Sequence, residues 1–152
     1  MQYRSLGVIS AVLISLVCTG SVLAAGDMTK QEPIEMKVSL GNDKNAMRFF
    51  PDKLEFETGK LYKLILHNEG KEKHYFSSEG LAQAVFTRKT QVVSADGKVI
   101  AEIKGTVREI EVYPGGTAEW WFVPVKATEI KDLKCTIKGH AEAGMTGSIT
   151  IK

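Results

Sequence analysis

Cysteine and histidine are scarce in this sequence, whose 152 residues include only two cysteines and three histidines. One cysteine, Cys18, lies in an N-terminal segment typical of a targeting signal, so Cys135 has no disulfide partner in the processed chain. A disulfide framework is therefore excluded. An excess of one charge is also lacking, because the formal net charge is +2, and +1 once Arg4 is removed with the signal. Nucleic-acid binding needs a concentrated basic patch, so that class is excluded as well.

Long apolar runs are lacking too. The apolar stretch 6–17 is shorter than the roughly 20 residues that a membrane-spanning helix needs. It follows the positive charge of Arg4 and precedes small residues that end at Ala24 and Ala25, where a signal peptidase would cleave. The sequence therefore predicts a cleaved signal peptide over residues 1–25 and an exported, periplasmic protein.

Two other arrangements of the N-terminus are less favoured. An uncleaved membrane anchor would need a longer apolar run. Lipid attachment at Cys18 would need a small residue before the cysteine, where the chain has Val17. Residues 26–33 are polar and predict a flexible arm, and residues 34–152 are enough for one domain with a real core. We expect this domain to be a monomer.

Short strands dominate the pattern of the predicted domain. Apolar and polar residues alternate in several segments, among them 34–40, 61–67, 107–113, 117–123 and 146–151. Turn signals separate them, such as Asn68-Glu69-Gly70 and Pro114-Gly115-Gly116. This pattern predicts an all-β fold, an antiparallel β-sandwich. We assign the large aromatic residues to its core: Phe49, Phe50, Tyr62, Trp120 and Trp121.

One short helix is expected, over residues 80–89, with Ser77 or Ser78 as its N-cap. It falls in a long insertion, residues 77–106, which also contains a hairpin signal at Asp96-Gly97. The sequence does not say whether this insertion contacts a partner or only covers the sandwich.

Near the C-terminus the chain places a thiol, an imidazole and a thioether within eleven residues, at Cys135, His140 and Met145. A lone thiol in an exported protein is a chemical liability unless something occupies it. Soft sulfur ligands together with imidazole select copper, and a site of two histidines, one cysteine and a weak axial methionine is an electron-transfer arrangement. Gly139 and Gly144 would allow the turns that bring His140 and Met145 back toward the thiol.

The second imidazole of such a site must be His67 or His74. His74 follows the turn after the strand 61–67, where a loop at the end of a sheet is expected. His67 is still within the alternating pattern of that strand. We therefore predict His74 as the ligand and His67 as a surface or edge-strand histidine.

These motifs resemble a known family. The pattern Cys-x4-His-x4-Met of residues 135–145, in a closing hairpin before Thr-Gly-Ser-Ile-Thr-Ile, resembles the copper loop of cupredoxins, the plastocyanin and azurin family. Asn68-x5-His74 resembles that family's first-histidine region, and residues 114–117 resemble the turn into its penultimate strands. The resemblance spans about residues 36–152. It implies a Greek-key β-sandwich with one type 1 copper, bound by residues matching His74, Cys135, His140 and Met145.

The sequence departs from the family pattern at three positions. Lys138 stands where many members have proline, and Leu133 replaces an aromatic residue often found before the cysteine. Tyr75 follows the first histidine, where asparagine is common and helps tie the two ligand loops together. Such hydrogen bonds around the ligands tune the rigidity and the potential of a copper site.

Other classes explain these residues less well. A nucleophilic cysteine paired with His140 would leave Met145 without a role, and zinc does not use methionine. A trinuclear oxygen-reducing centre needs many more imidazoles than three. A buried cysteine near an unrelated histidine is the remaining alternative.

We therefore expect that the protein is not an enzyme and has no small-molecule substrate. The favoured function is a one-electron carrier between periplasmic or membrane redox partners that dock near His140. A copper chaperone or copper-resistance protein is the alternative, and it is less favoured because the five methionines are scattered.

Overall fold

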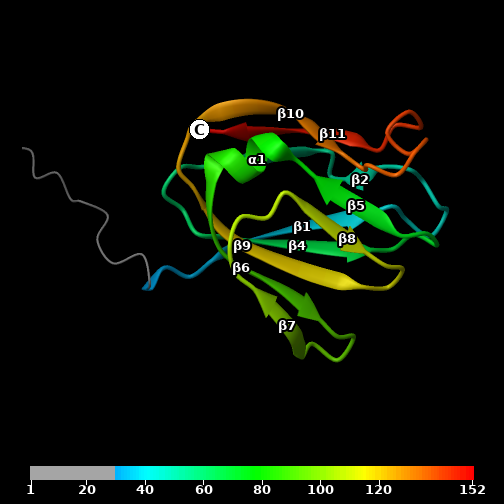
Figure 1. Ribbon diagram of the computed structural model, residues 1–152, viewed down its shortest axis with the longest axis horizontal. Coiled ribbons are helices and arrows are strands. Elements are labelled where there is room, and N and C mark those ends of the chain that lie inside the picture. The colour runs from blue at the N-terminus through cyan, green and yellow to red at the C-terminus, as the bar shows by residue number, and fades with distance from the viewer. Residues whose placement is uncertain (1–29) are drawn as a thin grey trace, which may run out of the picture.

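The structure, a computed structural model, describes residues 30–152 (Figure 1). The predicted signal peptide, Cys18 and half of the predicted arm, residues 26–29, lie outside the described residues. Within the described part of the chain, no helix is both long and apolar enough to cross a bilayer.

Two β-sheets lie face to face (Figure 1). The first sheet contains, in spatial order, β2 (Phe49–Phe50), β1 (Ile34–Leu40), β4 (Tyr62–Asn68), β9 (Thr117–Pro124), β6 (Val85–Val93) and β7 (Val99–Ile103). The second sheet contains β3 (Lys53–Phe56), β11 (Thr146–Ile151), β10 (Thr128–Lys134), β5 (His74–Ser77) and β8 (Glu109–Val112). The predicted β-sandwich is thus confirmed.

Most ladders are antiparallel, as expected, but each sheet also contains one parallel pair, so both sheets are mixed. Strand β1 runs parallel to β4, with Ile34 opposite Tyr62, and β3 runs parallel to β11. The other ladders are antiparallel. Alternation of side chains has the same two-residue period in both kinds of pairing, so it cannot distinguish them.

The core lies between the sheets and is built from one face of each strand. Trp120 and Phe49 are almost completely buried, as predicted, but their neighbours Trp121 and Phe50 are not. Consecutive strand residues point to opposite faces of a sheet, so only one member of each aromatic pair enters the core. Trp121 is half-buried on the outer face, where the Lys89 ammonium lies 4.5 Å from its ring centroid.

The single described helix, α1, spans Glu79–Ala84 and is shorter than predicted. Ser78 is its N-cap, because its Oγ accepts a hydrogen bond of 3.0 Å from the Leu81 amide. Residues 85–89, assigned to the helix from the sequence, instead begin β6 and pair with β9. The run Val85-Phe86-Thr87 is rich in β-branched and aromatic residues, which favour a strand.

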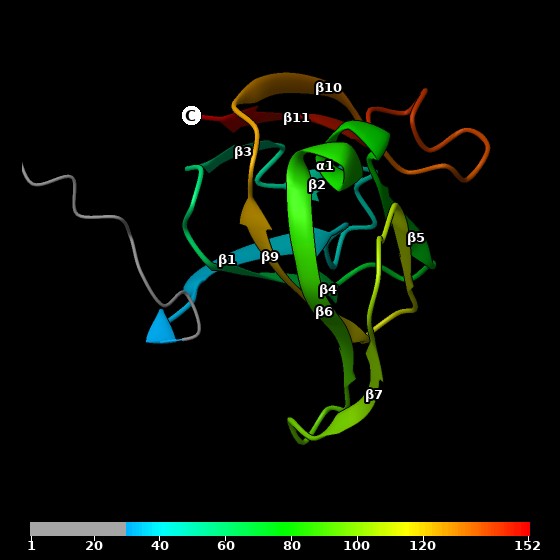
Figure 2. The same cartoon turned by 60° about the vertical axis from the view of Figure 1, so that its left-hand side comes forward.

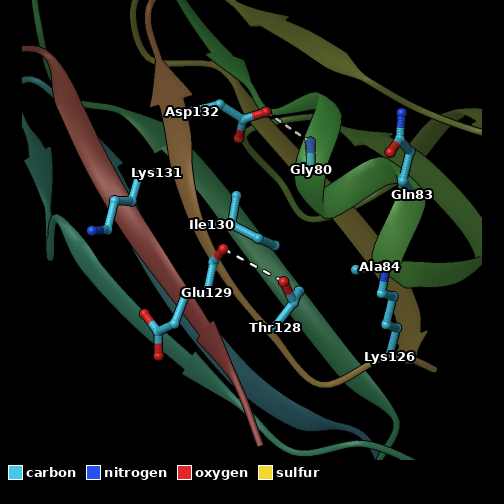
Figure 3. A pocket seen from close by; sticks show the side chains of 9 residues that line it. All are labelled: Gly80, Gln83, Ala84, Lys126, Thr128, Glu129, Ile130, Lys131 and Asp132. Atoms are coloured by element: carbon cyan, nitrogen blue, oxygen red, sulfur yellow. Dashed lines mark hydrogen bonds between the residues drawn. The ribbon is translucent and has the colours of Figure 1, made fainter.

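Helix α1 packs closely on β10 (Figure 3). A Cβ on Gly80 would lie 2.8 Å from the Ile130 side chain, so a larger residue would push the helix away. The Asp132 carboxylate accepts hydrogen bonds from the Gly80 amide and the Ser78 hydroxyl. A hollow of about 370 Å³ remains between the two elements. Further along the insertion, β6 and β7 form the hairpin predicted around Asp96-Gly97.

Candidate metal centre

Three adjacent strands of the second sheet bring the predicted ligands to one end of the sandwich. Strand β5 begins at His74, β10 ends one residue before Cys135, and β11 begins one residue after Met145. The order of these strands in the sheet is β11, β10, β5. Segments that lie more than sixty residues apart in the chain therefore meet beside the loop between β10 and β11, at the right of Figure 1.

Three donor atoms converge at this end: Nδ1 of His74, Sγ of Cys135 and Nδ1 of His140, all within 4.8 Å of one another. The two Nδ1 atoms are 3.2 Å apart, and Sγ lies 3.5 Å from Nδ1 of His140. All three residues are buried, with exposed fractions of 0%, 1% and 8%. Donors that each lie about 2.0–2.3 Å from one ion are spaced roughly 3–4 Å apart, so this group fits a single metal.

The loop between β10 and β11 is closed by its own backbone. Gly139 and Gly144 have φ angles of +89° and +108°, the left-handed region that favours glycine, as the sequence predicted. The amide of Met145 donates to the carbonyl of His140 at 2.9 Å, and the amide of Cys135 donates to the carbonyl of Met145 at 3.0 Å. Met145 is fully buried in the core. Its role as the fourth ligand stays a prediction.

Asn68 holds the segment that leads to His74. Its side chain is fully buried and makes three hydrogen bonds to the backbone. Nδ2 donates to the carbonyls of Glu72 and Val112 at 2.8 and 2.7 Å, and Oδ1 accepts from the Gly70 amide at 2.8 Å. Asn68 therefore fixes the turn between β4 and β5 and, with it, the position of His74.

Two glycines leave room for the His74 ring. A Cβ on Gly41 or Gly70 would lie 3.2 or 3.0 Å from Nε2 of His74. This Nε2 is buried without a hydrogen-bond partner, while Nδ1 faces the cluster. Burial, and secondly the neighbouring His140 ring, lowers the pKa of His74 below its ordinary value. A neutral imidazole with Nδ1 directed at the cluster is the form that binds a metal.

The thiol has a hydrogen-bond donor of its own. The backbone amide of Tyr75 donates to Sγ of Cys135 at 3.3 Å. This bond joins the segment that carries His74 to the loop that carries the other donors. Because the backbone makes the connection, the departure from the family's asparagine at position 75 does not remove it.

His140 lies nearest the surface. About 10% of its side chain is exposed, and its Nε2 is 3.6 Å from a Glu72 carboxylate oxygen. The other ring nitrogen, Nδ1, faces Cys135 and His74. One imidazole therefore spans from the donor cluster to solvent.

His67 lies apart from this group. It is half-buried in β4, and its Nδ1 is 2.9 Å from the Thr117 hydroxyl. Of the two placements expected, surface or edge strand, the edge strand does not apply, because β4 lies between β1 and β9. Its neighbours Leu66 and Asn68 are buried, so alternation directs His67 to the outer face of the sheet.

Sequence reasoning missed the residues that support the donors. Asn68 stands in a turn signal and in a motif that resembles the family's first-histidine region, but nothing local marks its three hydrogen bonds to the backbone. The close approaches of Gly41 and Gly70 to His74, and the Tyr75 amide bond, depend on contacts between distant segments.

No protein-family model and no curated protein matches the chain. Solved structures do resemble it. A multicopper oxidase from Campylobacter jejuni is 19% identical with a TM-score of 0.58, over 80% of this chain and 31% of that one. The McoA multicopper oxidase from the hyperthermophile Aquifex aeolicus is 17% identical with a TM-score of 0.57, over 79% of this chain and 29% of that one.

Another similar structure is close to this chain in size. Auracyanin B is 15% identical with a TM-score of 0.51, and the match covers 80% of this chain and 91% of auracyanin B. By contrast, the chain spans about a third of the length of the multicopper oxidases. The chain thus has the cupredoxin fold, and its buried His74-Cys135-His140 group fits one type 1 copper site.

Proposed function

We propose that this chain is a type 1 copper protein that carries single electrons. The observation that carries the proposal is the buried group of two imidazole nitrogens and one thiol within 4.8 Å. This donor set selects copper and is the arrangement of blue-copper electron-transfer sites. His74, Cys135 and His140, with Met145 as a fourth ligand, would hold copper there, and copper would supply a one-electron Cu(I)/Cu(II) couple.

The protein's own contribution is to hold the donors still. Asn68 fixes the approach to His74, and the Tyr75 amide fixes the thiol from the same side. On the other side of the donor cluster, the Met145 backbone is hydrogen-bonded to the backbones of Cys135 and His140, which restrains the loop. Donors restrained from both sides keep their positions in both oxidation states, which favours fast electron transfer over metal release.

His140 is the proposed point of electron entry and exit. Its ring reaches from the donor cluster to the surface, and the neighbouring surface residues Ala141, Ala143 and Gly144 are small. A redox partner can therefore approach the imidazole edge closely. The proposed partners are other redox proteins of the periplasm or membrane, and the proposed location is the periplasm, reached by the signal peptide over residues 1–25.

The structural likeness to multicopper oxidases does not lead us to propose an oxidase. The whole sequence has three histidines, and two of them already belong to the donor cluster. The third, His67, is bonded to Thr117 on the outer face of the sheet. A chaperone or copper-resistance role is the alternative to the carrier, and it would require the buried donors to release copper readily.

One experiment separates carrier from chaperone. The copper-loaded protein is cycled repeatedly between oxidised and reduced states, and loss of Cu(I) to a weak competing chelator is measured alongside. We expect full recovery of the oxidised spectrum over many cycles and slow transfer to the chelator. Rapid loss of Cu(I) to the chelator would favour the chaperone and contradict the proposal.

The assignment of the two histidines is tested by His67→Ala. Because His67 contacts Thr117 and lies apart from the donor cluster, we expect the visible spectrum and the copper stoichiometry of the variant to match those of the unchanged protein. Absorption spectra of copper-loaded samples provide the measurement, and His74→Ala is the matched variant that should lose the band. A band lost on His67→Ala would show that the wrong histidine had been assigned.

A further inference from the structure

Glu72 reaches the surface edge of the proposed copper site. It lies in the turn between β4 and β5, whereas His140 lies in the loop between β10 and β11, and Figures 1 and 2 show both connections at the same end of the sandwich. One carboxylate oxygen of Glu72 is 3.6 Å from Nε2 of His140. The Glu72 side chain is 56% exposed, and that of His140 is 10% exposed. A solvated carboxylate thus adjoins the ring nitrogen of His140 that does not face the donor cluster.

The surrounding chain holds Glu72 in this position. Its backbone carbonyl accepts a hydrogen bond of 2.8 Å from Nδ2 of Asn68, whose side chain is fully buried. The next residue, Lys73, directs its ammonium to a Glu111 carboxylate oxygen at 2.8 Å. This neighbouring cation is therefore engaged elsewhere and does not offset the Glu72 charge beside His140.

The geometry of His140 decides which of its nitrogens carries the proton. In a neutral imidazole one nitrogen carries a proton and the other has a free lone pair. Nδ1 of His140 lies 3.2 Å from Nδ1 of His74 and 3.5 Å from Sγ of Cys135, so it is the nitrogen available to a metal. Metal binding through Nδ1 leaves the proton on Nε2, next to Glu72. At 3.6 Å the carboxylate acts on this N–H as a nearby charge, because a direct hydrogen bond would be shorter.

A carboxylate in this place strengthens the ligand that it faces. A negative group at the second nitrogen of a metal-bound histidine raises the basicity of that histidine. It also favours the higher charge on the bound ion, because Coulomb attraction grows with that charge. Both effects stabilise Cu(II) relative to Cu(I). We propose that Glu72 is a positioning residue of the copper site, which acts through His140 to strengthen Cu(II) binding and to lower the reduction potential. This inference rests on the proposed function, because it requires copper at the donor cluster.

The Glu72 charge also reaches the other histidine of the cluster. Burial, and secondly the neighbouring His140 ring, lowers the pKa of His74, while the Glu72 charge acts in the opposite direction. Both imidazole donors therefore lie within the range of this one carboxylate.

Glu142 offers a matched comparison. It is exposed and lies two residues after His140 in the same loop, whereas the ion pair of His140 is with Glu72. If the reduction potential responded only to the net charge at this end of the molecule, removing either carboxylate would shift it equally. If it responds to the contact with His140, the Glu72 change should have much the larger effect.

The test compares Glu72→Gln with Glu142→Gln in the full-length, copper-loaded protein. Each variant removes one negative charge and keeps the size of the side chain. We expect Glu72→Gln to weaken Cu(II) binding about tenfold relative to Cu(I) binding. For a one-electron couple this raises the reduction potential by about 59 mV. Glu142→Gln should cause only a small part of this shift. Redox titration of the visible band measures the potential, and competition with chelators measures the affinity for each oxidation state.

A measurement without copper separates this role from a purely structural one. Urea unfolding of the copper-free Glu72→Gln variant should have an unchanged midpoint, because an exposed ion pair contributes little to stability. An intense band with a potential that Glu72→Gln does not raise, or that Glu142→Gln raises equally, would overturn this inference alone. If the unchanged protein bound copper without the intense band, the proposed function would fail, and this inference with it.

Discussion

Replacing Cys135 with serine is expected to abolish the visible absorption of the copper-loaded, oxidised protein. A blue-copper band arises from charge transfer between a cysteine thiolate and Cu(II), and a serine hydroxyl neither ionises as readily nor binds as a soft ligand. The structure places Sγ of Cys135 within 3.5 Å of the His140 Nδ1, with the Tyr75 amide as a hydrogen-bond donor at 3.3 Å. Absorption spectra of oxidised and reduced samples, with copper counted per chain, provide the measurement.

Replacing Met145, the proposed fourth ligand, distinguishes the contribution of the Cys135 thiolate to the spectrum from that of the other ligands. Met145→Leu should keep the strong absorption, because the thiolate remains, but should shift the reduction potential upward. Leucine also preserves the volume of a fully buried side chain, so the fold should tolerate it. A colourless oxidised protein that still holds one copper per chain would refute the type 1 assignment.

Replacing Asn68 with alanine is expected to destabilise the protein strongly. The Val112 carbonyl and the Gly70 amide would each lose a partner in the buried interior, and the Glu72 carbonyl would lose one at a partly buried position. A buried polar group left unpaired costs about 1–3 kcal/mol. We therefore expect the free energy of unfolding to fall by about 3 kcal/mol or more. Urea unfolding of the copper-free protein measures this free energy without a contribution from the metal.

Asn42→Ala is the matched control. The Asn42 side chain also accepts backbone hydrogen bonds, from the amides of Lys44 and Ala46 at 3.0 Å, but it lies in a turn with greater access to water. Water can replace the hydrogen bonds of Asn42, so we expect the free energy of unfolding to fall by about 1 kcal/mol or less. If the two variants were equally stable, Asn68 would not organise the approach to His74.

Asn68→Ala should also weaken the metal site more than the loss of stability alone would predict. His74 follows the turn that the Asn68 side chain holds by hydrogen bonds. Cys135 and His140 instead lie on a loop that is closed by its own backbone hydrogen bonds. The variant should therefore bind copper with an altered spectrum even under conditions where it is folded.

Local signals in the sequence predicted most of the strands but not their partners. The alternation in residues 34–40 and 61–67 identified β1 and β4, because side chains on a strand alternate with a period of two wherever one face is buried. The same alternation could not show that these strands run parallel. It also could not show that Trp121 and Phe50 face outward while Trp120 and Phe49 enter the core.

The sequence by itself determined the chemistry of the candidate site. The types and spacing of Cys135, His140 and Met145 mark a soft-ligand loop, and glycines at 139 and 144 mark its turns, because these properties depend only on neighbouring residues. Only the tertiary structure decided that His74 Nδ1 lies 3.2 Å from His140 Nδ1, and that Asn68, Gly41 and Gly70 shape the space around it. Such distances result from the packing of strands far apart in the chain, which no local pattern encodes.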